Sequence, residues 1–365
     1  MTTTDTPRAQ ADRTYPSYAK ALWQRVLLTR EFAVIALLLI VFFYSRSEIP
    51  NFDGPLTIYY LLLDVAPILL IALPMTLVII TGEIDLSVAS VVGLSSVLVG
   101  DLHQGGMSIP MAALVAILVG VLCGAFNGFL IAYVGLPSLA VTIGTLALYR
   151  GLAVGLLGTT AITDFPEKWT DLAKDRIGDS SYPVIVIPIL VLVILFVLLL
   201  HFTPFGRGVF DIGLNDEAAH FSGVNVARTK FWLFVMAGAV SAFAGIYFTL
   251  RFGSSRGDNA TGMELQVIAA VLLGGVSIFG GRGALHGVLA GVLLIGVLQS
   301  ALRLDDVSAN VINIIIGILL IASVMSTSFL TFVARTTAGM KRRASDGSPE
   351  RRQRQASAHH EGNNS

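Results

Sequence analysis

The stretch PMAALVAILVGVLCGAFNGFLIA, residues 110–132, decides the class of fold because it is apolar from end to end apart from Asn127. It is 23 residues long and contains no charged side chain. A transmembrane helix needs about 20 consecutive apolar residues to cross the hydrocarbon core of a bilayer. This stretch therefore predicts a helix that spans a membrane.

Nine further stretches share this apolar character, although 27–45 contains Arg30 and Glu31 and 84–101 is short. Of the 365 residues, 54% are hydrophobic and 13% are charged, and the mean hydropathy is +0.76. Soluble domains carry about 25% charged residues. The sequence thus predicts an all-α, polytopic membrane protein with about ten transmembrane helices. The expected spans are 27–45, 61–81, 84–101, 110–132, 137–159, 184–203, 231–250, 264–280, 284–302 and 308–328.

The distribution of basic residues predicts which side of the membrane each connection occupies. With both termini in the cytoplasm, the inner segments hold sixteen Lys and Arg residues and the outer segments hold seven. Cytoplasmic segments of membrane proteins are enriched in Lys and Arg, so this orientation is favoured. We expect a cytoplasmic N-terminal segment over 1–26, a transmembrane domain over 27–330, and a disordered, basic cytoplasmic tail over 331–365. The tail is suited to contact anionic lipid headgroups, whereas the zero net charge gives no indication of a nucleic-acid partner.

Glycines recur at four-residue spacing in three of the expected spans. Small residues at this spacing let two helix backbones approach closely in a membrane. We therefore expect these faces to pack against other helices rather than to act as gates. The sets are Gly120, Gly124 and Gly128, then Gly151 and Gly155, then Gly287 and Gly291.

The loop at 204–230, on the inner side in this arrangement, predicts a short polar helix. Asn215 is a good N-cap residue, since its side chain can accept from free amides of the first turn. Asp216 and Glu217 then lie at the positive end of the helix dipole, and Gly223 is suited to end the helix. Such a helix is too short to span the membrane. It is either a solvated connector or a docking element for a cytoplasmic partner.

Three long segments, in the same order along the chain, resemble the permeases of bacterial ATP-binding cassette (ABC) sugar importers. This family includes ribose, xylose, rhamnose and autoinducer-2 permeases. The resemblance covers about residues 60–328 and is closest to the rhamnose and autoinducer-2 subgroup. The three segments are GEIDLSV at 82–88, with Glu83 where Gly is more usual, the run from Gly213 to Lys230, and GMELQVIAAVLLGGVSIFGGRG at 262–283. Shorter matches are ALPMT at 72–76, Gly144–Gly151 and FGSSRGD at 252–258.

The resemblance implies a complex in the bacterial inner membrane. Two permease subunits, identical or different, would form the pathway, and the subgroup favours a heterodimer. Two cytoplasmic subunits would bind ATP and magnesium, and a periplasmic or extracellular binding protein would deliver the sugar. Spans two to five and seven to ten would be inverted repeats, as the opposite starting sides of spans two and seven allow. The residues implied in coupling to the ATPase are Gly213, Asn215, Glu217, Ala218, Ala219, Ser222, Gly223 and Lys230.

The chain lacks sequence signals for chemistry of its own. It contains no G-x-x-x-x-G-K-[ST] phosphate loop, so energy must come from another subunit or from an ion gradient. Its six histidines are scattered, and no metal-site spacing is present. We therefore expect a subunit that is not an enzyme and binds no cofactor or metal. An ion-coupled secondary sugar transporter is the alternative, although such a transporter would need buried carboxylates within its spans and few are available.

Several polar residues near or within the spans are candidates for the translocation pathway or a gate. Asp85 and Ser87 lie where one span ends and a short one begins, and interrupted helices often line transport pathways; the same residues could simply cap a helix. Arg150 either pairs structurally, reaches the outer interface, or lines the pathway. For Asn127 a hydrogen bond between helices is favoured over contact with sugar. The full set is Asp85, Ser87, Asn127, Thr145, Arg150 and Glu264.

The charges also indicate the type of solute. Few charges lie within the spans, and the outer loop 160–183 mixes five acidic residues with three basic ones. Such a rim is suited to docking a soluble binding protein by charge complementarity. We expect a neutral, polyhydroxylated solute, with a deoxyhexose such as rhamnose first and autoinducer-2 second.

Overall fold

The computed structural model describes residues 30–323 and residue 325, and these residues form helices joined by short connections. Two isolated bridges, Ile162 with Ser255 and Arg176 with Pro183, are the β-type pairings in this part of the chain. The predicted all-α class is confirmed. The helices are α2 (Arg30–Glu48), α3 (Pro55–Ile80), α4 (Val88–Gln104), α5 (Ile109–Ala132), α6 (Ser138–Leu157), α7 (Glu167–Lys174), α8 (Val186–Phe202), α9 (Pro204–Leu214), α10 (Asp216–Phe221), α11 (Val226–Phe252), α12 (Met263–Leu273) and α13 (Leu285–Leu304), followed by a helix over Ala309–Ser323.

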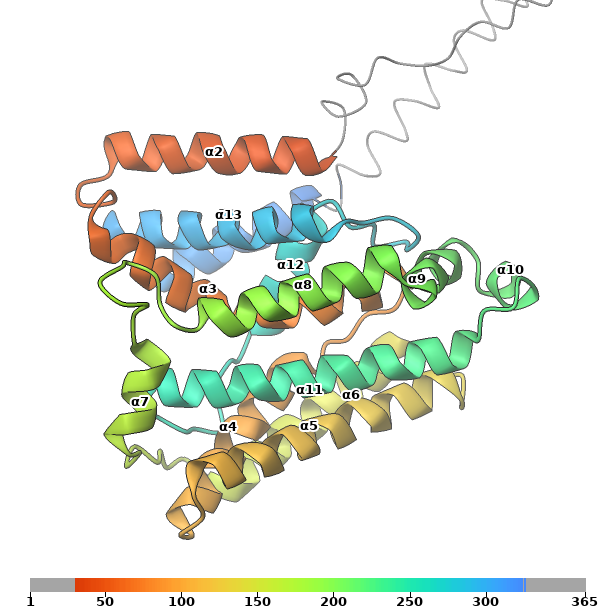
Figure 1. The fold of residues 1–365 in the computed structure, drawn as a ribbon, viewed down its shortest axis with the longest axis horizontal. Coiled ribbons are helices and arrows are strands. Elements are labelled where there is room, and N and C mark those ends of the chain that lie inside the picture. The colour runs from red at the N-terminus through yellow and green to blue at the C-terminus, as the bar shows by residue number, and fades with distance from the viewer. Residues whose placement is uncertain (1–29, 324, 326–365) are drawn as a thin grey trace, which may run out of the picture.

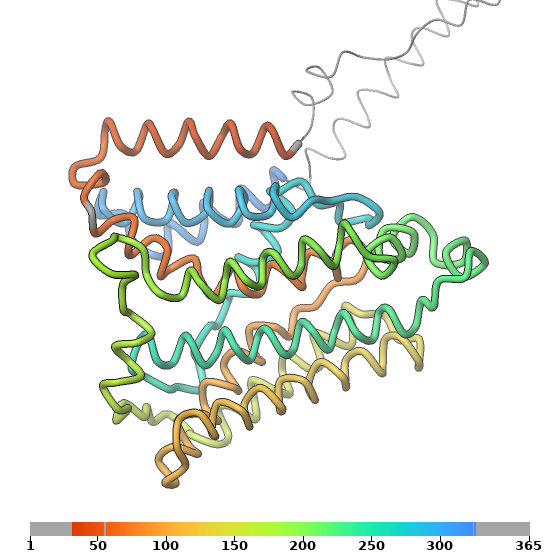
Figure 2. Tube along the Cα trace, viewed as in Figure 1, coloured from red at the N-terminus to blue at the C-terminus, as the bar shows by residue number. Residues whose placement is uncertain are grey.

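The long helices run side by side along one axis of the bundle, with a short helix at each end. Figure 1 shows α2, α13, α8, α11 and α5 along this axis, α7 at one end and α10 at the other. Figure 2 follows the chain between these two ends, which we call the α7 end and the α10 end. The loops 160–183 and 204–230 are therefore at opposite ends, as the predicted topology requires. Which end faces the cytoplasm stays a prediction.

Each of the ten predicted spans has a helix at its position. Among the described residues, five helices are long and apolar enough to cross a membrane: α5, α6, α11, α13 and residues 56–80 of α3. The pair α8 and α9, bent by 68°, also qualifies if it is taken as one span. The chain is thus a polytopic membrane protein, while the count of ten stays a prediction. Residues 27–29, 324 and 326–328 of the outermost spans lie outside the described residues, as do the segments 1–26 and 331–365.

Among the differences from the predicted boundaries, three have a clear local cause. The span expected at 264–280 is helical only as far as Leu273, because Gly275, Gly280 and Gly281 take left-handed backbone angles. The span expected at 84–101 begins at Val88, after a non-helical segment. Within the loop 204–230, α9 continues α8 beyond its bend, because Thr203 caps α9 and accepts from the Gly206 amide.

Helix α3 is the centre of the fold. Every residue from Val65 to Ile80 is buried, and the helix packs against α8, α11, α12 and α13. A helix that is apolar all round is expected to be buried. In contrast, α5, α6 and α8 each expose one row of large apolar side chains, among them Leu122, Leu152 and Leu195. These outer faces are therefore available to lipid or to another chain.

The packing of glycine faces is confirmed for two of the three predicted sets. A Cβ atom added to Gly120, Gly124 or Gly128 would meet the α11 backbone, and one added to Gly287 or Gly291 would meet α12 or the start of its following turn. Among the described residues, the prediction is wrong for the third set. A Cβ atom at Gly151 or Gly155 of α6 would have no neighbour within 4 Å.

The contacts of α3 and α11 are those that an inverted repeat requires, although the repeat itself stays a prediction. α11 packs on α5 and α4, and α3 packs on α13 and α12. If α3–α6 and the segment from α11 onward are equivalent repeats, α11 corresponds to α3, and α4 and α5 correspond to α12 and α13. The first long helix of each repeat would then pack mainly on helices of the other repeat.

We predict that Gly124→Leu destabilises the isolated chain, because the new side chain would strike the carbonyl of Phe234 and the Cα atom of Val235. Overpacking of a tight contact costs about 1–3 kcal/mol. Thermal unfolding of the purified chain in detergent would measure the effect. Gly144→Leu is the matched control, since a Cβ atom there has no neighbour within 4 Å. Equal loss of thermal stability in both variants would contradict the packing of α5 on α11.

Candidate functional site

The segment 83–87 crosses the bundle without helical structure, between the end of α3 and the start of α4. Helix α3 stops at Ile80, and Gly82 takes a φ of 82°, which a residue with a side chain rarely adopts. The backbone of Ile84 is held by α6: its amide donates to Ser138 Oγ at 3.2 Å, and its carbonyl accepts from Thr142 Oγ1 at 3.2 Å. Side chains thus replace the hydrogen bonds that a continuous helix would have made.

A chain of buried polar side chains leads inward from this segment. Asp85 is 2% exposed and accepts from the Ser87 amide at 2.9 Å and the Ser87 hydroxyl at 2.6 Å. Asn127, from α5, donates to Ser87 Oγ at 2.8 Å. The hydroxyl of Tyr149, from α6, reaches the Cys123 carbonyl at 3.0 Å and Asn127 Oδ1 at 3.4 Å. The favoured hydrogen bond of Asn127 between helices is confirmed. This network joins the interrupted segment to α5 and α6.

Within the described residues, no hydrogen bond joins Thr145 or Glu264, two other pathway candidates, to Asp85, Ser87 or Asn127. Thr145 donates within its own helix, to the Thr142 carbonyl at 3.4 Å. Glu264 is in the first turn of α12, where an acidic residue complements the helix dipole. The structure therefore brings together Asp85, Ser87 and Asn127 but not the whole predicted set.

Arg150 is bonded to main-chain carbonyls of the bundle, so structural pairing, one of the three roles that the sequence allowed, is the one observed. Its guanidinium donates to the carbonyls of Gly257 at 2.8 Å, Asn259 at 2.7 Å and Ala89 at 3.2 Å. Gly93 leaves room for it, since a Cβ atom there would meet Arg150 Nη1. Arg150 thereby fastens the loop 253–262 to α4 and α6, and these three bonds offset the cost of placing a cation within a span.

A second cluster, which the sequence did not single out, fixes the same loop at the α7 end. Ser96 Oγ accepts from Thr249 Oγ1 at 2.6 Å and from Asn259 Nδ2 at 2.9 Å. The Ser255 hydroxyl donates to the Ser96 carbonyl at 2.8 Å. Ser and Thr are so common in membrane helices that residue type alone could not have identified this cluster.

The predicted short helix in the loop 204–230 is α10. Asn215 Oδ1 accepts from the Ala218 amide at 2.8 Å, which confirms the N-cap, and Gly223 ends the helix with a φ of 91°. Ala219 faces inward, while Glu217 and Phe221 point outward, Phe221 with 88% of its surface exposed. Helix α10 thus presents an acidic and an aromatic side chain at the end of the bundle.

Lys230 is not on this exposed loop, contrary to the sequence prediction. Asn225 caps α11 through a bond to the Arg228 amide, so α11 begins at Val226 and Lys230 lies in its second turn. The Lys230 ammonium donates to Asp216 Oδ2 at 2.6 Å and to Glu83 Oε1 at 2.7 Å, and its side chain is 11% exposed. One cation therefore joins α10 to the interrupted segment between α3 and α4.

Gly213 also has an internal role rather than an exposed one. The Gly281 amide donates to the Ile80 carbonyl at 2.8 Å, and Gly213 lies against both groups so closely that a Cβ atom would overlap them. The end of α9, the end of α3 and the glycine-rich connection 274–284 consequently meet at one point. Parts of the three family-like segments 82–88, 213–230 and 262–283 therefore lie close together at the α10 end.

Sequence reasoning missed Glu83, Asp216, Ile80 and Gly281 as partners in this region. A signal existed for Glu83, because it replaces the glycine more usual in that motif and a new carboxylate near a membrane needs a cation. Asp216 was noted only for the helix dipole. Ile80 contributes a main-chain carbonyl, which no side-chain pattern could have indicated.

Comparison with known proteins is consistent with this geometry. Residues 57–324 match the family described as "Branched-chain amino acid transport system / permease component". The chain is 38% identical over 265 residues to the autoinducer 2 import system permease protein LsrD of Yersinia enterocolitica, covering 71% of this chain and 80% of that protein. It is 35% identical over 317 residues to the LsrD proteins of Yersinia pseudotuberculosis and Yersinia pestis. Each of these matches covers 85% of this chain and 92% of the relative. No solved structure matches the chain. The resemblance to permeases of bacterial ABC sugar importers is thereby confirmed, and the chain belongs to this family of multi-pass permease components.

Proposed function

We propose that this chain is the permease subunit of an ABC importer that moves a neutral, polyhydroxylated solute, with autoinducer-2 as the first candidate and rhamnose as the second. The observation that carries the proposal is the 35–38% identity to autoinducer 2 import permeases over most of the chain. It reverses the order that the sequence motifs favoured. Family membership also favours ATP-driven import over an ion-coupled secondary transporter.

In the proposed mechanism, α10 docks on an ATP-binding subunit and transmits its movement into the membrane domain. The outward side chains of Glu217 and Phe221 suit this contact. The Lys230 ammonium would carry the movement from Asp216 to Glu83, and thus to the segment that ends at Ser87. That segment, with its bonds to Asn127 and α6, would act as the gate. The chain itself changes no covalent bond.

A second permease subunit would cover the open glycine face of α6. The other glycine-repeat faces of the described residues are packed within the chain, whereas Gly144, Gly151 and Gly155 of α6 face empty space. Leu148 and Leu152 flank these glycines and are about half exposed, at 49% each. A face of small residues bordered by leucines is the type that packs against another helix in a membrane.

The solute assignment is tested by uptake into vesicles that contain the reconstituted complex. Labelled autoinducer-2 should accumulate, rhamnose more weakly, and ribose and xylose least, and uptake should require both ATP and the binding protein. Because few charged side chains lie within the spans, a charged compound should not compete. Uptake that is equal without the binding protein, or driven by a proton or sodium gradient without ATP, would contradict the proposal.

We predict that Lys230→Met uncouples ATP hydrolysis from transport. The substitution keeps the apolar stem but leaves Glu83 without its cation. We expect destabilisation of roughly 2 kcal/mol, less than the 3–5 kcal/mol of a fully buried pair, because the half-exposed Asp216 is screened by water. ATPase activity and solute uptake should be measured on the same vesicles. Lys230→Arg should restore coupling, and Arg46→Met, at an exposed position in the last turn of α2, is the control. Normal transport by Lys230→Met at normal expression would exclude the relay.

The interface on α6 is tested by disulfide trapping in membranes that contain the assembled complex. With Cys123 replaced by Ala, Leu148→Cys should cross-link to a cysteine on the facing helix of the second permease. Leu195→Cys, on the exposed face of α8, should not cross-link. Trapping through α8 with none through α6 would place the partner on a different face.

A further inference from the structure

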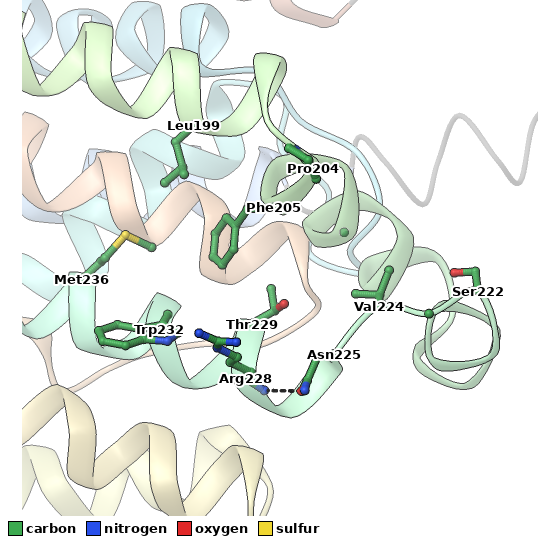
Figure 3. Close-up of a pocket in the computed structure, with 12 residues that line it drawn as sticks. Leu199, Pro204, Phe205, Ser222, Val224, Asn225, Arg228, Thr229, Trp232 and Met236 are labelled. Atoms are coloured by element: carbon green, nitrogen blue, oxygen red, sulfur yellow. Dashed lines mark hydrogen bonds between the residues drawn. The ribbon is translucent and has the colours of Figure 1, made fainter.

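A groove of about 710 Å³ lies between α8, α9 and the first turns of α11, directly beside α10. Leu199, Phe205, Trp232 and Met236 line one part of it, and Figure 3 shows their side chains around the space between α8 and α11. The part toward α10 is lined by polar residues and backbone. These are Ser222, Gly223, Asn225, Arg228 and Thr229.

The polar and apolar parts of the groove are ordered like the headgroup and acyl chains of a phospholipid in the surrounding membrane. Its apolar part adjoins α8, whose outer face exposes Leu195 and Leu198, and α11, which is long enough to span. Its polar part adjoins the connection between α10 and α11. Trp232 lies between the two parts and is 46% exposed, in a position typical of tryptophan at a membrane interface.

The polar part also has an unused positive charge. Within the described residues, the guanidinium of Arg228 makes no ion pair or hydrogen bond; only its backbone amide is bonded, to Asn225 Oδ1. Figure 3 shows the guanidinium directed into the groove, beside Trp232. Arg228 is in the first turn of α11, where the helix dipole adds to its positive charge. The expected occupant is therefore anionic at one end and apolar at the other.

We propose that this groove binds an anionic phospholipid from the leaflet at the α10 end, with its phosphate on Arg228 and an acyl chain along Leu199, Phe205 and Met236. Because Ser222 and Gly223 also line the groove, a bound lipid contacts the turn that ends α10. Lipid composition would thereby influence the position of this helix. The inference depends on the membrane placement of α8 and α11 and not on the solute that the chain carries.

The test uses quenching of Trp232 by brominated lipids. The chain has three tryptophans; Trp23→Phe and Trp169→Phe leave Trp232 as the reporter. The full-length protein is placed in phosphatidylcholine nanodiscs with increasing mole fractions of chain-brominated phosphatidylglycerol or chain-brominated phosphatidylcholine. We expect phosphatidylglycerol to quench at an about fivefold lower mole fraction, the factor that corresponds to about 1 kcal/mol per basic residue at an anionic surface.

Two variants separate a specific site from general attraction of anionic lipid. Arg228→Gln should abolish the preference for phosphatidylglycerol, and Arg228→Lys should retain part of it. Arg207→Gln is the matched control, since Arg207 is an exposed arginine on α9 that does not line the groove, and it should retain the full preference. Equal quenching by both lipids in the parent protein, or an equal loss of preference in Arg228→Gln and Arg207→Gln, would overturn the proposal.

Assembly distinguishes lipid from a protein occupant. The same measurement is repeated after the ATP-binding subunits and the second permease are added. Persistence of the phosphatidylglycerol preference supports a lipid site. Protection of Trp232 from both brominated lipids on addition of either subunit would identify that subunit as the occupant and refute the inference.

Discussion

The structure depends on one constraint: within a bilayer no water is available to hydrogen-bond the backbone, so every amide and carbonyl at membrane depth needs an internal partner. A continuous helix meets this requirement by itself, but this chain interrupts its helices near both ends of the bundle. At each interruption the missing bonds come from other elements. Ser138 and Thr142 hold the backbone of Ile84, and Arg150 holds the carbonyls of Gly257 and Asn259. At the connection 274–284, the Gly281 amide is paired with the Ile80 carbonyl.

Because side-chain hydrogen bonds replace helical backbone bonds there, the non-helical segments are fixed in position and yet suited to move. A side-chain hydrogen bond can be exchanged without unfolding a helix, whereas the bonds within a helix are lost and gained together. The segment that ends at Ser87 is held by three side chains from α5 and α6, those of Asn127, Ser138 and Thr142, and by its own Asp85. At the start of the segment, Glu83 is held by an ion pair to Lys230. The ion pairs of Lys230 thus connect α10 to this segment, as the proposed coupling requires.

The lipid surroundings also account for the distribution of glycine. Since lipid tails are as apolar as the side chains of the protein, close backbone contact and not burial alone holds the helices together. Gly120, Gly124 and Gly128 bring α5 against α11, and Gly213 lets α9 touch the end of α3. The α6 face with Gly151 and Gly155 lacks such a partner within the described residues. This is consistent with a protein that is one subunit of a larger assembly.

The sequence by itself determined the all-α membrane class, the positions of the helices at the ten expected spans, the N-cap at Asn215 and the family. These features depend on local composition and on short motifs, which act within a few residues of their own position. Only the tertiary structure decided that Arg150 binds carbonyls, that Lys230 is buried between Asp216 and Glu83, and that the face of Gly151 is open. Each of these depends on residues 14 to 147 positions away, or on the absence of a neighbour among the described residues. Residue type states what a side chain can bind, but the partner that satisfies it is selected by the packing of the whole bundle.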